Sequence, residues 1–277
     1  MPTVDVRSTQ TYEVTAETVF LLQVAAAGGP GQQIQSELLT LSGAVGNDAL
    51  ESFSIGCESG RGHRVLCPPG QITIDYQAAV ATEPVVVDAV QPVHPPADIP
   101  ADTLRYLVPS RYCESDKLVD WATQTFGQYE RDDSLVMAIA NWIYDSFQYV
   151  PGATVATTSA ADVVGTGQGV CRDYAHLMIA ACRALEIPAR YVSGYVANLD
   201  PPDFHALVEV YVGDGWYVFD PTRLAPRTGL VPIARGLDAA ETAFCTISGQ
   251  ASLLEQQVIA TRRDGQQPTE PPRLRMC

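Results

Sequence analysis

Four prolines stand between Gln91 and Ala101, and the pattern of the sequence changes on either side of them. Proline cannot donate a backbone hydrogen bond and keeps the chain extended, so this segment cannot belong to a regular helix or an inner strand. We therefore predict a linker over residues 91–104, with a domain on each side. Hydrophobic residues make up 46% of the chain, which is enough for both domains to bury a core.

Residues 1–90 have the pattern of β structure. Glycine and proline clusters, such as Gly28–Pro30 and Pro68–Gly70, separate short runs that are β-branched or alternate in polarity. These runs are Tyr12–Ala25, Leu38–Leu41, Gln71–Ala79 and Val85–Val90. The alternation is regular from Gln71 onward, as in a strand with one face in water. The sequence predicts a small antiparallel sandwich or barrel.

Residues 105–250 begin with helical patterns. Ser115 and Asp116 can cap a helix that runs to about Phe126, and Asp133 with Ser134 can cap a second one. Residues 151–170, rich in glycine and threonine, are expected to form a loop.

A third helix is predicted from Cys171 to Glu186, and strands are predicted near 189–196, 205–212 and 216–220. Helices followed by strands, without βαβ alternation, favour an α+β fold. Residues 251–277 are polar and contain several prolines, so a tail or strap is expected there.

Cys171 is expected at the first turn of its helix, directly after Gly167–Val170. The unpaired N–H groups and the macrodipole of a helix start favour a thiolate there. The glycines would let the backbone approach a substrate carbonyl, and the Cys171 amide could donate to an oxyanion. The alternative is a buried structural cysteine, which is how we interpret Cys182 among its alanines.

A nucleophilic thiol needs a base, and the chain has four histidines: His63, His94, His176 and His205. His63 is in the other domain and His94 is in the linker. His176 is five positions along the same helix as Cys171 and points round the cylinder, so a packing role is expected for it. His205 remains as the candidate base.

His205 and Asp220 stand at opposite ends of a predicted β-hairpin that turns at Gly213–Gly215. If Val212 faces Gly215, Asp220 faces Leu207 and lies on the same side of the sheet as His205, diagonal to it. A one-residue slip would separate the two side chains. In the first register Asp220 can fix the tautomer of the imidazole and leave its other nitrogen for the thiol.

Two stretches, residues 169–195 and 205–222, resemble the core of transglutaminase-like proteins, and the β-rich first part is similar to the bacterial branch of that superfamily. The resemblance implies a papain-like α+β core. It places Cys171, His205 and Asp220 on the positions of the catalytic triad, and gives Arg190 and Glu209 structural roles near the site. The second oxyanion donor of the family often comes from an upstream aromatic, for which Tyr149 and Trp142 are candidates. No metal and no organic cofactor are implied.

The reaction implied is acyl transfer through a thioester. Hydrolysis of a peptide or amide bond is the leading hypothesis. Amide-bond formation by amine capture uses the same residues and stays open, as does a non-catalytic peptide-binding module on the same fold. The expected partner is a peptide or protein substrate, and the sequence indicates neither its identity nor the oligomeric state.

The formal net charge of −15 disfavours binding to phosphate backbones and to anionic lipid, so nucleic acid and membranes are not expected partners. Seven cysteines are scattered without a C-x-x-C pair, which argues against a structural zinc site and against a disulfide framework. The apolar run Val19–Ala27 is too short and too far from the start for a signal peptide. We therefore expect the protein in the cytoplasm.

Overall fold

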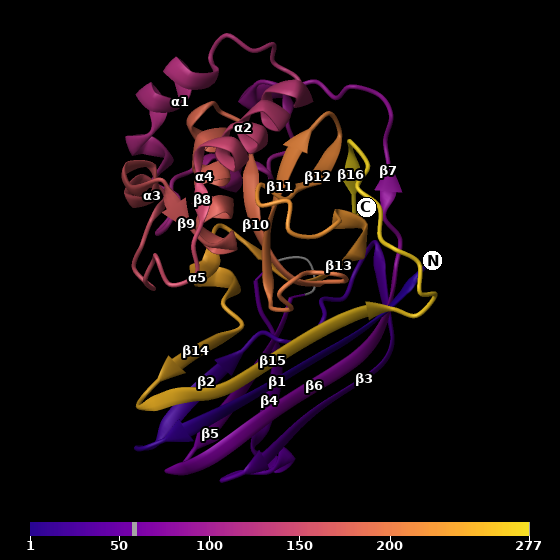
Figure 1. Cartoon of the computed structure of the whole chain (residues 1–277), viewed down its shortest axis with the longest axis vertical. Coiled ribbons are helices and arrows are strands. Elements are labelled where there is room, and N and C mark those ends of the chain that lie inside the picture. The colour runs from indigo at the N-terminus through magenta and orange to yellow at the C-terminus, as the bar shows by residue number, and fades with distance from the viewer. Residues whose placement is uncertain (57–59, 277) are drawn as a thin grey trace.

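Strands from both ends of the sequence form the β domain, the lower part of the molecule in Figure 1. The computed structural model describes residues 1–56 and 60–276. One sheet has the antiparallel order β15 (Ala251–Arg262), β1 (Thr3–Val14), β6 (Gly70–Thr82), β3 (Gln32–Gly43). The other has the antiparallel order β14 (Cys245–Ser248), β2 (Thr18–Leu22), β5 (Arg61–Cys67), β4 (Leu50–Ser54).

The two sheets pack face to face, as predicted for an antiparallel sandwich. Their shared core contains Tyr12, Phe20 and Ile72, and the rings of Tyr12 and Phe20 lie 5.2 Å apart. The run from Tyr12 to Ala25 is two strands instead of one, because the backbone turns between β1 and β2.

The prediction of a tail or strap for residues 251–277 is wrong for 251–262. These residues form β15, which pairs with β1 along its length, and β14 also joins the β domain by pairing with β2. Only Val258 of β15 is buried, whereas Leu253 and Leu254 are 49% and 55% exposed. Because backbone hydrogen bonds hold this edge strand, its side-chain pattern gave little sign of a sheet.

The upper part is an α+β core, as the sequence predicted. A six-stranded sheet has the order β13 (Leu230–Gly236), β10 (Ala189–Val196), β11 (His205–Val212), β12 (Gly215–Phe219), β16 (Leu274–Arg275), β7 (Val85–Val86). Its helices are α1 (Val119–Phe126), α2 (Asp133–Ser146), α3 (Ala160–Thr166), α4 (Cys171–Ala184) and the short α5 (Ala239–Thr242). The central helix α4 packs against the sheet through residues such as Ala175 and Met178, which are fully buried.

Helix α3 lies within residues 151–170, where a loop was expected. Ser159 and Asp162 cap it reciprocally, with the Ser159 N–H donating to Asp162 Oδ2 over 3.0 Å. Gly167 ends it in a left-handed conformation with φ 67°. Two short parallel strands lie on either side of this segment, β8 (Gln148–Tyr149) and β9 (Gln168–Gly169).

The two parts share an apolar core, so the β domain is fixed against the core sheet. Val6 and Tyr76 of the sandwich pack with Tyr195, Phe204 and Ile233 of the upper part. The Tyr195 hydroxyl also donates to the carbonyl of Val24 over 2.7 Å. This contact ties β10 of the core sheet to the segment that follows β2.

The proline-rich segment is held along the upper part. The Asp133 amide donates to the carbonyl of Gln91, and the Gly213 amide donates to that of Pro92. None of the helices in the described ranges has the length and apolar character that a membrane span requires.

A buried ion cluster ties three strands of the core sheet together. Glu209 on β11 accepts from Arg190 on β10 over 2.6 Å and from Arg235 on β13 over 2.9 Å. Burial alone would raise the pKa of Glu209, but the two guanidinium groups outweigh it and lower that pKa to about 2. Arg190 and Glu209 thus hold the strands beside the site, as expected.

Candidate active site

Cys171 is the first residue of α4, as predicted, and its side chain is half-buried. Asp173 caps this helix start: its Oδ2 accepts from the Val170 amide over 2.9 Å. A Cβ atom at Gly169 would lie 2.7 Å from the Cβ of Asp173. Gly169 is therefore needed for the cap, a different role from the close substrate approach that the sequence suggested.

His205 begins β11 and meets Asp220 just after the end of β12. The register pairs Val212 with Gly215 and Val208 with Phe219, which is the predicted register. Nε2 of His205 lies 2.8 Å from Oδ2 of Asp220, and both side chains are buried. The Cys171 side chain also acts on the imidazole and raises its pKa. Because Nε2 faces Asp220, Nδ1 is the ring nitrogen left for the sulfur.

The imidazole of His205 is stabilised in its protonated form. Burial alone would lower the pKa of His205, but the charge of Asp220 and the hydrogen bonds with Asp220 and Cys171 outweigh it and raise this pKa to about 10. For Asp220, burial acts to raise the pKa, yet the charge of His205 and hydrogen bonds from His205 and Thr222 hold it below its ordinary value. The pair is thus arranged to carry a proton on the imidazole.

Thr222 orients the Asp220 carboxylate, a role that the sequence analysis did not assign. Its hydroxyl and its amide both donate to Oδ1 of Asp220, over 2.6 Å and 2.9 Å. Oδ2 is therefore directed to His205. The signal was present in the Asp220–Pro221–Thr222 sequence, because an aspartate side chain commonly accepts from the backbone two residues further on.

Of the two aromatic candidates for an oxyanion donor, the structure brings Tyr149 to the site. Burial and the neighbouring Cys171 side chain raise the pKa of Tyr149, although the backbone of Cys171 acts to lower it, so its hydroxyl lies beside Cys171. Pairing of β8 with β9 aligns Tyr149 with Gly169, two residues before Cys171. Trp142 instead packs in an aromatic cluster, with its ring 5.4 Å from that of Trp121 and 5.8 Å from that of Phe147. The expectation for Trp142 is thus not supported by its position.

Comparisons with known proteins identify the family of the chain. A model of the transglutaminase-like superfamily matches residues 119–221. A crystal structure named "Putative Cysteine Protease" from Cytophaga hutchinsonii superposes with a TM-score of 0.92 at 39% identity, over 97% of this protein and 93% of the other. The chain belongs to the transglutaminase-like superfamily.

Two uncharacterized mycobacterial proteins are also similar. ML0607 of Mycobacterium leprae is 32% identical over 124 residues, which are 42% of this chain and 44% of that protein. Rv2569c of Mycobacterium tuberculosis is 29% identical over 149 residues, 54% of this chain and 45% of the other. The match thus spans less than half of the length of each of these two relatives.

A cavity of about 340 Å³ opens beside the sulfur of this transglutaminase-like site. Cys171 and His205 line it together with Phe204, Ala206 and Phe244. The rings of Phe204 and Phe244 are stacked 4.2 Å apart. Phe204 precedes the strand that carries His205, and Phe244 lies in the segment that leads into the β domain. Their stacked rings form one wall of the cavity, so both parts of the molecule shape it.

Asp173 also holds the loop that precedes α3, which the sequence analysis missed. Its side chain is fully buried and accepts from the Thr154 hydroxyl over 2.6 Å and from Arg172 over 2.9 Å. Arg172 in turn donates to the carbonyl of Val155 over 2.8 Å. The start of α4 and the rim of the cavity are thus tied together.

His176 has the packing role that the sequence predicted. Its ring stacks on Tyr112 with centroids 5.0 Å apart, and its Nε2 accepts from the Ala239 amide over 3.2 Å. Burial lowers the pKa of His176 to about 3, so it stays neutral. Within residues 1–56 and 60–276, no cluster of histidine, cysteine and acidic side chains could hold a metal ion.

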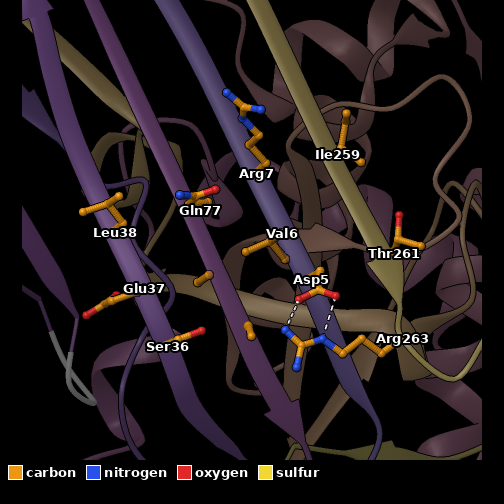
Figure 2. Close-up of a pocket in the computed structure, with 12 residues that line it drawn as sticks. Asp5, Val6, Arg7, Ser36, Glu37, Leu38, Gln77, Ile259, Thr261 and Arg263 are labelled. Atoms are coloured by element: carbon orange, nitrogen blue, oxygen red, sulfur yellow. Dashed lines mark hydrogen bonds and ion pairs between the residues drawn. The ribbon is translucent and has the colours of Figure 1, made fainter.

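A separate hollow of about 490 Å³ lies on the outer face of the β15–β1–β6–β3 sheet, as Figure 2 shows. Its charged side chains are paired: Asp5 with Arg263 over 2.8 Å, Arg7 with Asp75 over 2.7 Å, and Glu37 with Arg61 over 2.7 Å. These pairs satisfy the charges of the hollow within the β domain itself.

Proposed function

We propose that this protein is a cysteine peptidase or amidase that works through a Cys171–His205–Asp220 triad. The single observation that carries the proposal is the series of contacts from Asp220 through His205 to Cys171 at the start of α4, beside an open cavity. The superfamily membership and the similarity to the Cytophaga hutchinsonii protein support a cysteine-type enzyme. The substrate is a peptide or protein amide.

The reaction begins with His205 as an imidazolium, whose Nδ1 holds the proton that the Cys171 thiol has given up. The sulfur attacks the amide carbonyl, and the negative charge that develops on oxygen is stabilised by the Cys171 amide and the Tyr149 hydroxyl. The intermediate collapses to a thioester as the amine leaves with the proton from His205. Water then attacks the thioester, with His205 as base, and releases the acid and the free thiol.

Asp220 acts through His205 in this scheme. Its carboxylate keeps the imidazole in one orientation and stabilises the positive charge that forms on the ring. Thr222 keeps the carboxylate in place. The Tyr149 hydroxyl, which contacts the Cys171 amide in the free protein, has to yield that amide to the oxyanion when substrate binds.

The experiment that tests this proposal is digestion of a peptide library by the wild-type protein and by Cys171→Ala, with products identified by mass spectrometry. Cleavage by the wild type alone, with a thioester trapped on Cys171, is the expected result. Ammonia release that requires an added amine would instead identify a transferase. No product from either protein, with uniform slow alkylation of the accessible cysteines, would identify a binding module.

The compartment we propose is the cytoplasm. The described cysteines are free thiols, at positions 67, 113, 171, 182 and 245, while Cys57 and Cys277 lie outside the described residues. Free thiols persist in a reducing compartment, which supports the proposal. Fractionation of cells with an antibody against the protein tests it, and recovery outside the cytoplasmic fraction would refute it.

A further inference from the structure

A second cavity, of about 500 Å³, adjoins the proposed triad on the side of α2. Two of its lining residues touch the catalytic groups. Tyr149 contacts Cys171, and Thr222 contacts both Asp220 and His205. A peptide bound across Cys171 can therefore extend into this cavity with one of its neighbouring residues.

Arg223 lines this cavity three residues after Asp220, and its backbone is strained. It has φ 54°, a left-handed conformation that residues other than glycine, asparagine and aspartate seldom adopt. Its amide donates to the Asp220 carbonyl over 3.3 Å, so the strain belongs to the turn that carries Asp220 and Thr222. Strained residues of this kind concentrate at functional sites.

The guanidinium of Arg223 is held at the rim of the cavity. It lies over the ring of Tyr144, 4.1 Å from the centroid, and Nη2 donates to Oδ1 of Asn141. These two contacts restrict an otherwise flexible side chain and leave most of its donors unused. Arg223 is exposed, so the remaining donors are open to a ligand.

No carboxylate within residues 1–56 and 60–276 forms an ion pair with Arg223. The protein is strongly acidic, and its other arginines near this region are paired, Arg227 with Glu270 and Arg273 with Asp133. The hollow on the β domain is different too, since its arginines already have partners: Arg263 pairs with Asp5, as Figure 2 shows, and Arg7 pairs with Asp75. A fixed, unpaired guanidinium is suited to a carboxylate, which it can bind through two parallel hydrogen bonds.

We propose that Arg223 is a specificity-determining residue that binds a carboxylate of the substrate, from an acidic side chain or from the C-terminus of a peptide, next to the bond that is cleaved. The proposal rests on the proposed peptidase function. The exposed rings of Tyr144 and Tyr149 provide apolar walls for the part of the peptide that brings this carboxylate to Arg223.

Asp145 lines the same cavity and has the opposite effect. Its charge repels an incoming carboxylate, whereas Arg223 attracts it. Opposite results are therefore expected for the two neutral variants. Arg223→Gln weakens the preference for carboxylates, and Asp145→Asn strengthens it.

The test uses full-length Cys171→Ala, which binds without turnover. The probes are acetylated alanine hexapeptides with one Glu or one Gln at each position in turn, each made with a free or an amidated C-terminus. Calorimetry should show at least about tenfold tighter binding for one Glu position, or for the free terminus, than for its neutral counterpart. The position of the effect distinguishes the two sources of the carboxylate.

The added Arg223→Gln change should reduce this ratio to about one, and Arg223→Lys should restore part of it. Arg131→Gln is the matched control, because Arg131 is also exposed and lies outside this cavity, where it donates to the carbonyl of Leu185. Thermal melting checks that each variant is folded. Equal or absent binding of the Glu and Gln peptides, or a ratio that Arg223→Gln leaves unchanged, would overturn the proposal.

Turnover by the variants that retain Cys171 separates this proposal from the proposed function. In a peptidase, Arg223→Gln should raise KM for the carboxylate peptide and remove the difference in KM between the carboxylate peptide and the neutral one. If the wild type cleaves no peptide while Cys171→Ala still prefers carboxylates, the peptidase function fails and the carboxylate site stands. If peptides are cleaved without charge preference, the carboxylate site fails and the peptidase function stands.

Discussion

Nε2 of His205 and Oδ2 of Asp220 lie 2.8 Å apart across the hairpin of β11 and β12, and the two residues are only 2% and 8% exposed. The pairing of Val208 with Phe219 puts them on the same face of the sheet. Since solvent barely reaches this contact, the charge on Asp220 acts on His205 with little screening. This contact and the groups around it decide how the site responds to substitution and to pH.

Asp220→Asn should lower kcat by at least about a thousandfold, because the imidazole loses the partner that fixes its tautomer and stabilises its charge. The pKa of His205 should fall as well, since burial then acts against the charged ring with less opposition. The alkaline limb of the kcat/KM profile therefore moves to lower pH. Rates measured from about pH 6 to about pH 11 check this, and an unmoved alkaline limb would contradict the assignment.

The same contact makes stability depend on pH in a defined direction. The pKa of His205 is raised from 6.5 to about 10, so its contribution is complete below pH 6.5 and is lost as the pH rises toward 10. The pKa of Asp220 is lowered from 3.8, so its contribution is complete above pH 3.8 and is lost on further acidification. Urea unfolding of the wild type and of the His205→Gln, Asp220→Asn double variant should show a difference that shrinks from about pH 6 to about pH 10. A difference that stays constant over this range would contradict the raised pKa.

Thr222→Val removes the hydroxyl that donates to Asp220 over 2.6 Å and keeps the shape of the side chain. We expect a loss of about 1–2 kcal/mol in the free energy of unfolding. We also expect a fall in kcat of about tenfold, because the carboxylate can rotate away from His205. Thr222→Ser keeps the hydroxyl and should stay near the wild type. Equal loss of activity in both variants would assign the effect to packing.

The sequence predicted those parts of the site where apolar and polar residues alternate or recur at a regular spacing. Alternation in the two arms indicated the hairpin, and the register hypothesised from its turn, in which His205 and Asp220 meet, is the observed one. The apolar face of the helix that begins at Cys171, together with the proline after it, indicated the position of the thiol. Both signals depend on local side chains, which a single sequence contains.

Most of what the sequence analysis missed or left open depends on contacts between distant segments. β15 pairs with β1 although almost the whole sequence separates them, and backbone hydrogen bonds leave little trace in side-chain polarity. Tyr149 reaches Cys171 through a two-residue parallel pairing that no periodicity reveals. The Ser159–Asp162 capping box was readable in principle, but the surrounding glycines and threonines favoured a loop.

Tyr149→Phe should show whether Tyr149 acts as an oxyanion donor or only as a wall of the cavity. The ring is kept and only the hydroxyl beside the Cys171 amide and thiol is lost. We expect kcat to fall by about 10- to 100-fold with KM within about twofold, because the lost interaction is made mainly in the transition state. Tyr144→Phe, at the rim of the adjoining cavity, is the control and should leave kcat unchanged. A change confined to KM would remove Tyr149 from the oxyanion site.

Asp173→Asn tests whether the cap of α4 also positions the nucleophile. The carboxylate is fully buried and serves the Val170 amide, Thr154 and Arg172 at once. Loss of its charge should cost about 2 kcal/mol in the free energy of unfolding. It should also lower kcat by about tenfold, because the first turn of the helix and the rim loop are no longer held together.

Asp162→Asn is the matched control, since Asp162 has the same capping position at the start of α3 and contacts Ser159. It should reduce the stability less than Asp173→Asn does, because Asp162 is exposed, and it should leave kcat unchanged. Urea unfolding and steady-state kinetics on both variants give the comparison. If kcat fell equally in both, the loss would follow from general destabilisation. If kcat falls in Asp173→Asn alone, the cap supports the nucleophile, because the carboxylate then acts on Cys171 through the backbone that it holds at the start of α4.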